Sequence, residues 1–180
     1  MDSPMSQENQ PSVLIRPRRE SDISAAAAGL VRVYASDGYP VEGVSHPESW
    51  LTPAGMIESW VAEISGVFVG HVLISRPMGE EAVSLWLDQS HDAEERVAVL
   101  ARLFVLPEAR QRSVGEKLMG EAVSYANRHG IRLVLDVLLK DAAAVRLYER
   151  VGWKRIGSAS HSFGAAQEAA ALCFVSPVDS

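Results

Sequence analysis

The chain has 180 residues, of which 47% are apolar and 22% are charged, and its formal net charge at pH 7 is −6. This length fits a single domain, because two domains of half the size would each have a small core. Acidic and basic residues are mixed along the chain without a basic face or stripe, which argues against a protein that binds nucleic acid.

No segment has the features of a secretory or membrane sequence. The first ten residues are polar and lack an apolar core, and no apolar run approaches the roughly 18 residues of a membrane helix. The single cysteine, Cys173, excludes an intramolecular disulfide and lies in an apolar run that is typical of a buried strand. We therefore expect a cytoplasmic protein with no membrane partner.

In chain order, residues 1–11 are predicted to be a disordered tail and residues 12–176 a single domain. The first half of this domain shows a short strand, a helix that Ser21 can cap, and a hairpin whose turn is Ser65-Gly66. An irregular stretch separates this helix from the hairpin, and Pro47 and Pro53 can each begin a short helix within it. We place these elements at residues 13–15 (strand), 21–37 (helix), 60–64 and 67–75 (hairpin strands).

The second half alternates strands and helices. Residues 77–96 are polar, with a strand near residues 83–87. Residues 97–105 are almost continuously apolar, which predicts a central strand buried on both faces. The later elements are expected at residues 113–129 (helix, stopped by Gly130), 131–138 (strand), 141–152 (helix, capped by Asp141), 153–156 and 170–175 (strands).

The strand at residues 97–105 is followed by a loop and directly by a helix, an arrangement that can bind an anion. The N-terminus of a helix presents unpaired N–H groups and a partial positive charge, which suit a pyrophosphate. Arg110 and Arg112 add positive charge, and Gly115 lets the backbone approach a ligand closely. A plain strand-loop-helix has the same outline, so this pattern by itself leaves the phosphate site open.

This segment resembles the first signature of the GNAT superfamily of N-acetyltransferases, which runs Val-x-Pro-x-x-Arg-Gly-x-Gly-Ile-Gly-x-x-Leu. Gln111 and Ser113 replace two of its glycines. The residues that match are Val105, Pro107, Arg110, Val114, Gly115 and Leu118. The resemblance implies that backbone amides of this loop hold the pyrophosphate of acetyl-CoA and that the end of the strand pairs with the pantetheine arm.

A second match follows one strand later, at residues 141–153. The family signature is Asn-x-x-Ala-x-x-Leu-Tyr-x-x-x-Gly-Phe, with Asp and Trp here in place of Asn and Phe. The matching positions are Asp141, Ala144, Leu147, Tyr148, Gly152 and Trp153. Together the two motifs imply an α+β fold, a central mixed and mostly antiparallel sheet that is splayed between its two central strands, with helices on both faces. The cofactor-binding residues that they imply are Leu103, Phe104, Val105, Arg110, Gln111, Arg112, Ser113, Val114, Gly115, Glu116 and Asp141.

Each of these positions also has a purely structural interpretation. Ser113 and Glu116 fit a capping box, in which they satisfy the helix N-terminus themselves, whereas the serine hydroxyl could instead donate to a phosphate. Tyr148 could be core filler, but a phenol beside the thioester could also protonate the departing thiolate. Asp141 could act only as an N-cap, because Asp cannot donate as an Asn amide does.

The sequence does not identify the base that takes the proton from the amine. Asp136 lies in an apolar strand, where some family members that acetylate protein N-termini carry a Glu, but it could equally pair with Arg132 or Arg155. Residues 97–105 offer no acid, although many family members have one there. Glu94 and Glu95 lie just upstream, and a chain of water molecules is another route.

The predicted function is therefore acetyl transfer from acetyl-CoA to a primary amine, through a ternary complex. Tyr39 would help to bind the acceptor, which is either a small-molecule amine or a protein amino group, and a homodimer is possible. The alternatives are a non-catalytic acyl-CoA-binding module and a plain scaffold for protein contacts. No metal site is expected, because no ligand spacing is present among His46, His71, His91, His129 and His161.

Overall fold

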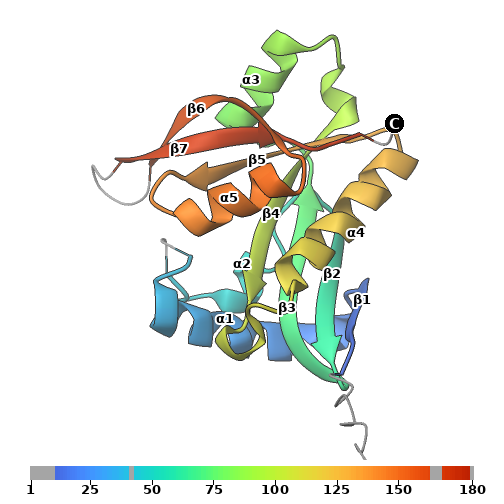
Figure 1. The fold of residues 1–180 in the computed structure, drawn as a ribbon, viewed down its shortest axis with the longest axis vertical. Helices are drawn as coiled ribbons and strands as arrows, with labels where there is room; N and C mark the ends of the chain where they lie inside the picture. The colour runs from blue at the N-terminus through green and yellow to red at the C-terminus, as the bar shows by residue number, and fades with distance from the viewer. Residues whose placement is uncertain (1–10, 41–42, 163–167, 179–180) are drawn as a thin grey trace, which may run out of the picture.

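The described residues build one mixed sheet of seven strands. The computed structural model describes residues 11–40, 43–162 and 168–178 (Figure 1). Within them the strand order is β1-β2-β3-β4-β5-β7-β6, and only β4 and β5 run parallel to each other. The strands are β1 (Val13–Pro17), β2 (Met56–Ile64), β3 (Val67–Ser75), β4 (Val97–Val105), β5 (Arg132–Leu138), β6 (Lys154–Ser162) and β7 (Glu168–Val175).

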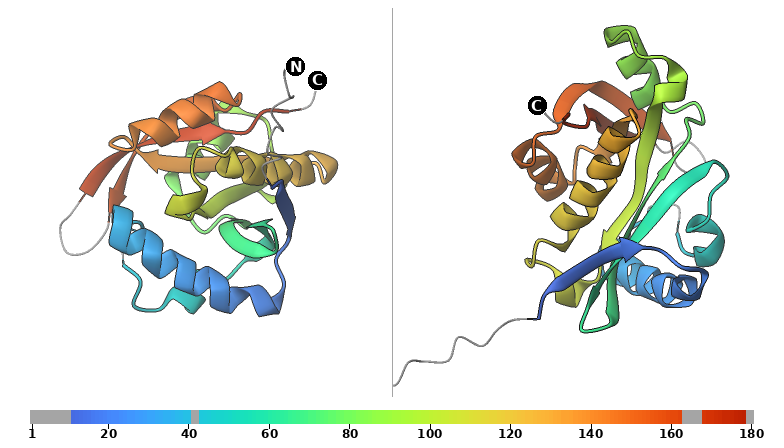
Figure 2. Two further views of the ribbon diagram at one scale, coloured as in Figure 1. Left: turned by 60° about the horizontal axis from the view of Figure 1, so that its bottom comes forward. Right: turned by 90° about the vertical axis from the view of Figure 1, so that its right-hand side faces the viewer.

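Helices cover both faces of this sheet, as Figure 2 shows. Helices α4 and α5 lie on one face, and their apolar sides share a core with alternate residues of β2 to β5 and β7. On the other face, α1 and α2 pack near the end of β4, and α3 packs over β4 to β7. The bounds are α1 (Ile23–Asp37), α2 (Pro47–Trp50), α3 (Glu81–Gln89), α4 (Val114–Arg128) and α5 (Ala142–Arg150), with 3-10 turns η1 (Glu20–Asp22), η2 (Glu94–Arg96) and η3 (Pro107–Ala109).

The two central strands separate after their first few residues. Val97–Val99 of β4 pair with Arg132–Val134 of β5, and beyond that point the described pairing between the strands ends. Both strands continue, β4 to Val105 and β5 to Leu138. A gap therefore opens between their C-terminal halves, and the predicted splayed α+β sheet is confirmed.

A bulge in β4 sets the geometry of this gap. Between the pairs His71↔Phe104 and Leu73↔Ala101, β3 advances by two residues and β4 by three, and Arg102 has a positive φ of 56°. Because side chains of a strand alternate between faces, one extra residue reverses the alternation beyond it. Before the bulge, the residues that face α4 and α5 have even numbers, as Ala98 and Leu100 do. After the bulge they have odd numbers, as Leu103 and Val105 do.

His71 of β3 holds the bulge in place from inside the protein. The carbonyl oxygen of Arg102 can only accept a hydrogen bond, so His71 Nδ1 donates to it, at 2.9 Å. Its Nε2 then accepts from Arg18 Nη1, also at 2.9 Å, and the same Nη1 donates to the carbonyl of Leu51. The imidazole is fully buried and stacks on Phe104. This chain of bonds ties β3, the bulge and the segments that flank α1 and α2 together.

Several predicted elements are confirmed closely. The central strand has the predicted bounds 97–105, the hairpin turns at Ser65-Gly66 with positive φ at both residues, and α1 and α4 end before Gly38 and Gly130. Strands β6 and β7 are longer than predicted because they pair with each other in a hairpin. Cys173 is buried in β7, and the tail predicted for residues 1–11 lies, apart from Pro11, outside the described residues.

Three local predictions were wrong. Residues 83–87 belong to α3, because Ala82, Val83, Leu85 and Trp86 follow the spacing of one helix face and pack on β4 to β7. Ser21 lies inside η1 and does not cap α1. The N-cap of α1 is Asp22, whose carboxylate instead accepts two bonds of 2.8 Å from the Arg16 guanidinium.

The third error concerns Pro53, which begins a turn into β2 and not a helix, with Met56 N donating to its carbonyl. Pro47 does occupy the first turn of a helix, as predicted. The two prolines differ because the four residues after Pro47 include the half-buried Trp50, which packs against Phe104, whereas Gly55 follows Pro53 with a positive φ.

We predict that the buried imidazole of His71 makes the folded state acid-sensitive. Burial, together with the positive charges of Arg18 and Arg102, lowers the pKa of His71 to about 4, although the hydrogen bond to the Arg102 carbonyl acts in the opposite direction. In the unfolded chain the imidazole of His71 has a pKa near 6.5, so its full contribution to the free energy of unfolding is present above that pH. This contribution is lost as the pH falls from there through the folded-state pKa. The loss should reach up to about 3 kcal/mol.

The measurement is the free energy of unfolding from denaturant titrations between pH 7 and pH 4. His71→Gln is the matched variant, because an amide can also donate to Arg102 and accept from Arg18. The wild type should lose more stability than this variant across the window. Parallel curves for the two proteins would show that His71 is not the acid-sensitive group.

Candidate active site in the gap between β4 and β5

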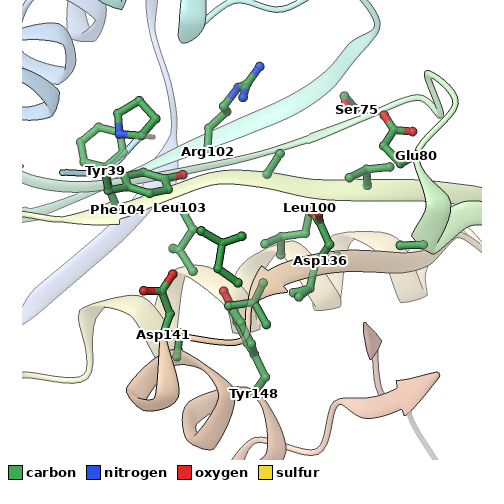
Figure 3. Close-up of a pocket in the computed structure, with 18 of the residues that line it drawn as sticks. Tyr39, Ser75, Glu80, Leu100, Arg102, Leu103, Phe104, Asp136, Asp141 and Tyr148 are labelled. Atoms are coloured by element: carbon green, nitrogen blue, oxygen red, sulfur yellow. The ribbon is translucent and has the colours of Figure 1, made fainter. Parts of the chain in front are cut away.

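A cavity of about 890 Å³ occupies the gap between the two central strands (Figure 3). Residues 99–105 of β4 and residues 135–138 of β5 line it, together with the ends of α1 and α2, the loop before α3, and residues of α4, α5 and β6. The cavity therefore reaches both faces of the sheet. It connects the side of α4 and α5, which carry the two sequence motifs, with the side of α1 to α3.

Tyr148 of α5 is placed at the α4–α5 side of this cavity. Its ring packs against Trp153 and Phe174, and only 8% of the residue is exposed. Figure 3 shows its hydroxyl end directed toward β4. Burial, followed by the negative charges of Asp141 and Asp136, raises the pKa of Tyr148 well above that of a free phenol. The phenol is therefore a proton donor throughout the neutral range and also part of the core.

Asp136 and Asp141 both line the same cavity. Asp136 is exposed on β5 and points across the gap toward β4 (Figure 3). The two arginines considered as its partners have other bonds, since Arg132 Nε donates to the Ser176 carbonyl and Arg155 pairs with Glu149. Asp141 precedes α5, and its side chain makes no capping hydrogen bond, so the interpretation of Asp141 as a simple N-cap is not supported.

The loop before α4 does not form the capping box considered for Ser113 and Glu116. Ser113 has φ of +60° and makes no side-chain capping bond, and Glu116 pairs instead with Arg150 of α5 at 3.4 Å. Gln111 has φ of +64°. These are the two positions at which the resembling signature has glycine, the residue that adopts a left-handed backbone without a steric cost. The loop thus keeps the glycine conformation with non-glycine residues.

Gly115, in the first turn of α4, lines the cavity. A methyl group added there would meet Val105 at 3.8 Å and Leu147 at 3.9 Å, which is ordinary van der Waals contact, and its φ is not positive. Neither packing nor backbone conformation within the protein requires a glycine at this position. The free surface that it leaves beside β4 fits the close approach of a ligand to the helix N-terminus.

The two loop arginines have partners inside the protein. Arg110 bonds to Asp37 at the end of α1, with Nη1 3.2 Å from Oδ1, and also to the Val105 carbonyl. This pair lowers the pKa of Asp37. Arg112 donates to the carbonyl of Pro11 at 2.6 Å. Both guanidinium groups brace the loop, and a direct contact of either one with phosphate stays a prediction.

The α1–α3 side of the cavity carries residues that the sequence motifs did not reveal. Tyr39, the predicted acceptor-binding residue, lines it and packs edge-on against Trp50 at 5.8 Å. Trp50 in turn lies under the guanidinium of Arg102. Other polar residues that line this side are Asp37, Ser75, Glu80, Glu81 and Ser160. Arg102 had one usable signal, a charge inside an otherwise apolar strand.

The remaining sequence predictions concern two acids upstream of β4, a metal site and a membrane helix. Glu94 and Glu95 are exposed in η2 and are not among the described residues that line the cavity. In the described ranges, no three His, Cys, Asp or Glu side chains are grouped to hold a metal ion. The same ranges contain no helix with the length and apolarity needed to cross a membrane.

Comparison with known proteins agrees with this arrangement. Residues 27–153 match the Acetyltransferase (GNAT) family. An uncharacterized N-acetyltransferase of Methanocaldococcus jannaschii, MJ1207, is 29% identical over 106 residues, which are 58% of this chain and 42% of that protein. The chain thus spans about two fifths of the length of this relative.

Solved structures show the same fold. Arabidopsis thaliana NAA60 in complex with acetyl-CoA has a TM-score of 0.69 at 17% identity, covering 92% of this chain and 98% of that one. The ribosomal-protein-S18-alanine N-acetyltransferase of Escherichia coli has a TM-score of 0.64 at 15% identity, covering 94% and 96%. With the family match over most of its length, the chain belongs to the GNAT acetyltransferase family.

The conformation of Ser113 gives a direct prediction. Ser113→Gly and Ser113→Ala both delete the hydroxyl, but only glycine relieves the left-handed backbone, which costs other residues about 1–2 kcal/mol. We expect the Gly variant to unfold with a free energy about 1 kcal/mol above that of the Ala variant. Denaturant titration of the two variants measures this difference. Equal stabilities would mean that the loop does not hold residue 113 at positive φ.

Proposed function

We propose that residues 12–176 form one acetyltransferase domain that transfers an acetyl group from acetyl-CoA to a primary amine by direct attack in a ternary complex. The observation that carries this proposal is the cavity between β4 and β5, which places Tyr148 and Asp136 beside one opening that reaches both faces of the sheet. Acetyl-CoA supplies an activated thioester. The residues of the chain bind it, orient the amine and move protons.

The residues proposed to hold acetyl-CoA surround the α4–α5 side of the cavity. The backbone of Leu103, Phe104 and Val105 lies beyond the last described pair of β4 with β5, so its polar groups can meet an extended ligand as they would meet a strand. The amides of residues 111–116 and the N-terminus of α4 suit the pyrophosphate. The positively charged Arg110 and Arg112 at the ends of this loop favour the same anion.

Tyr148 is proposed to donate the proton that the departing sulfur needs. The environment that raises the pKa of Tyr148 consists of apolar rings and two carboxylates. Such an environment disfavours a thiolate as well, because burial raises the pKa of any acid that becomes an anion. A hydrogen-bond donor at this place therefore stabilises the leaving group where solvent does not.

Asp136 is proposed as the group that takes the proton from the attacking ammonium. It is an exposed carboxylate in the gap, on the strand that faces β4, and β4 itself has no acid between Val97 and Val105. Tyr39 is proposed to help to bind the acceptor. The acceptor is a small-molecule amine or a protein amino group, and a cytoplasmic location and a homodimer stay predictions.

Thiol release from acetyl-CoA across a panel of amines tests the proposal, with Tyr148→Phe as the variant. This change keeps the ring and deletes the hydroxyl, so turnover should fall at least about tenfold, since general acid catalysis contributes roughly a hundredfold or more. The melting temperature should hardly change. The matched control is Tyr125→Phe on α4, a ring that packs on Trp60 and His129, for which full turnover is expected.

The alternative of a non-catalytic acyl-CoA-binding module predicts a different result. Acetyl-CoA would then still raise the melting temperature, because a ligand at a concentration of a hundred times its dissociation constant stabilises the folded state by about 2.7 kcal/mol. No amine would release thiol in either protein. Full activity of Tyr148→Phe would instead leave acetyl transfer in place and remove the proposed role of the phenol.

A further inference from the structure

A primary amine of the chain itself lies on the cavity between β4 and β5. The chain contains three lysines, which are Lys117 on α4, Lys140 between β5 and α5, and Lys154 on β6. All three lysines are exposed to solvent, but of the three Lys140 alone is among the described residues that line the cavity. Its position therefore distinguishes Lys140 from two lysines that are also open to reagents in solution.

The backbone that carries Lys140 is held in a tight turn. Asp141 N donates to the Leu138 carbonyl at 2.9 Å, and Leu139 N donates to the Ala170 carbonyl of β7, also at 2.9 Å. The side chain is less constrained, since within the described residues its ammonium has no hydrogen-bond or ion-pair partner. A fixed backbone and a flexible four-carbon stem allow the amine to move while its point of attachment stays at the cavity.

The residues proposed to move protons come from the same stretch of chain. Asp136 on β5 shortly precedes Lys140, Tyr148 on α5 follows it, and all three line one cavity. Figure 3 shows Asp136 and the hydroxyl end of Tyr148 directed toward β4, across the gap. The carboxylates of Asp136 and Asp141 attract an ammonium. An amine in this cavity therefore meets a base that can accept its proton and an acid that can donate to sulfur.

We propose that Lys140 is a self-acetylation site, to which the protein transfers the acetyl group of its own bound acetyl-CoA. This inference rests on the proposed acetyl transfer and adds an acceptor within the chain. Acetylation turns the ammonium of Lys140 into a neutral amide. Among the described residues that line the cavity, Arg102 is then the remaining cation, so the modified cavity is more negative than the unmodified one.

The step balances with the groups already named. The Lys140 ammonium first gives one proton to Asp136. The neutral Nζ then attacks the carbonyl carbon of the thioester, so that an N–C bond forms and the C–S bond breaks. The departing sulfur takes the proton of Tyr148, and the second proton that the nitrogen loses returns the phenol to its neutral form. The products are acetyl-lysine, the thiol of CoA and one proton, which Asp136 releases to solvent.

Incubation of the full-length protein with acetyl-CoA, in the absence of any added amine, tests the proposal. Peptide mapping by mass spectrometry follows acetylation of the three lysines over time. Lys140 should be acetylated at least about tenfold faster than Lys117 or Lys154, because an amine tethered at the site has a high effective concentration. Reaction with acetyl-CoA in free solution does not favour one exposed lysine in this way. The three sites are compared in one protein, so the result does not depend on the folding of a variant.

Variants and dilution identify the route. Tyr148→Phe should slow the acetylation of Lys140 about tenfold or more and leave the slow reaction of the other two lysines unchanged. Lys140→Arg keeps the charge without the primary amine and should lose the main acetylated species, whereas Lys117→Arg, the matched control, should keep it. The rate per molecule at Lys140 should not change on dilution of the protein. Equal rates at the three lysines, a rate that rises with protein concentration, or an unchanged rate in Tyr148→Phe overturns the proposal.

An amine panel, assayed by thiol release, separates this inference from the proposed function. If amines are acetylated and Lys140 reacts no faster than Lys117 and Lys154, acetyl transfer is supported and self-acetylation is contradicted. If Lys140 is acetylated selectively and no amine releases thiol, self-acetylation is supported and transfer to an external acceptor is contradicted. If neither reaction occurs, both are contradicted.

Discussion

The hydrogen bond from His71 to the Arg102 carbonyl holds β4 at the point where it leaves regular strand geometry. The extra residue at this bulge reverses the facing of every later side chain of β4. Leu103 and Val105 thereby face α4 and α5, while Arg102 and Phe104 face α1 and α2. Because β5 stops pairing with β4 just before the bulge, the same short segment opens the gap and decides which groups line each side of it.

The chemistry proposed for the gap follows from how charge and burial are divided around it. On the α5 side, a phenol is kept protonated by apolar rings and by two carboxylates. On the α1 side, a guanidinium rests on a tryptophan. The loop before α4, which is proposed to bind the pyrophosphate, lies on the proposed cofactor side, and its arginines bond to Asp37 and Pro11. One opening thus joins two differently charged half-sites, an arrangement that suits a reaction between two ligands.

Much of the fold and of the candidate site was predictable from the sequence, at places where the local residue pattern agrees with the role of the segment in the tertiary structure. The apolar run of β4, the glycine stops of α1 and α4 and the two GNAT motifs each carry their own signal, and Tyr148 and Asp141 of the second motif line the cavity. The helix α3 was missed because five apolar-rich residues fit a strand and one helix face equally well. The bulge could not be predicted, because it depends on the register with β3 and on His71, 31 residues away in sequence.

Ser113 shows a different limit of sequence reasoning. Its spacing to Glu116 fits a capping box, but the left-handed backbone of the loop turns the serine away from that role, and Glu116 bonds to α5. The glycines of the resembling signature were the better guide, since they report the conformation and not the side chain. Likewise, a lone charge in an apolar strand drew attention to Asp136, and the same argument applied to Arg102 with equal force.

The most direct test of the account is a crystal structure of the protein with acetyl-CoA bound. The pantetheine arm should run along residues 103–105 in the gap between β4 and β5, with the pyrophosphate on the amides of residues 111–116. The thioester sulfur should lie within hydrogen-bonding distance of the Tyr148 hydroxyl, on the opposite side of β4 from Arg102. A cofactor bound outside the gap, or a sulfur directed away from Tyr148, would contradict it.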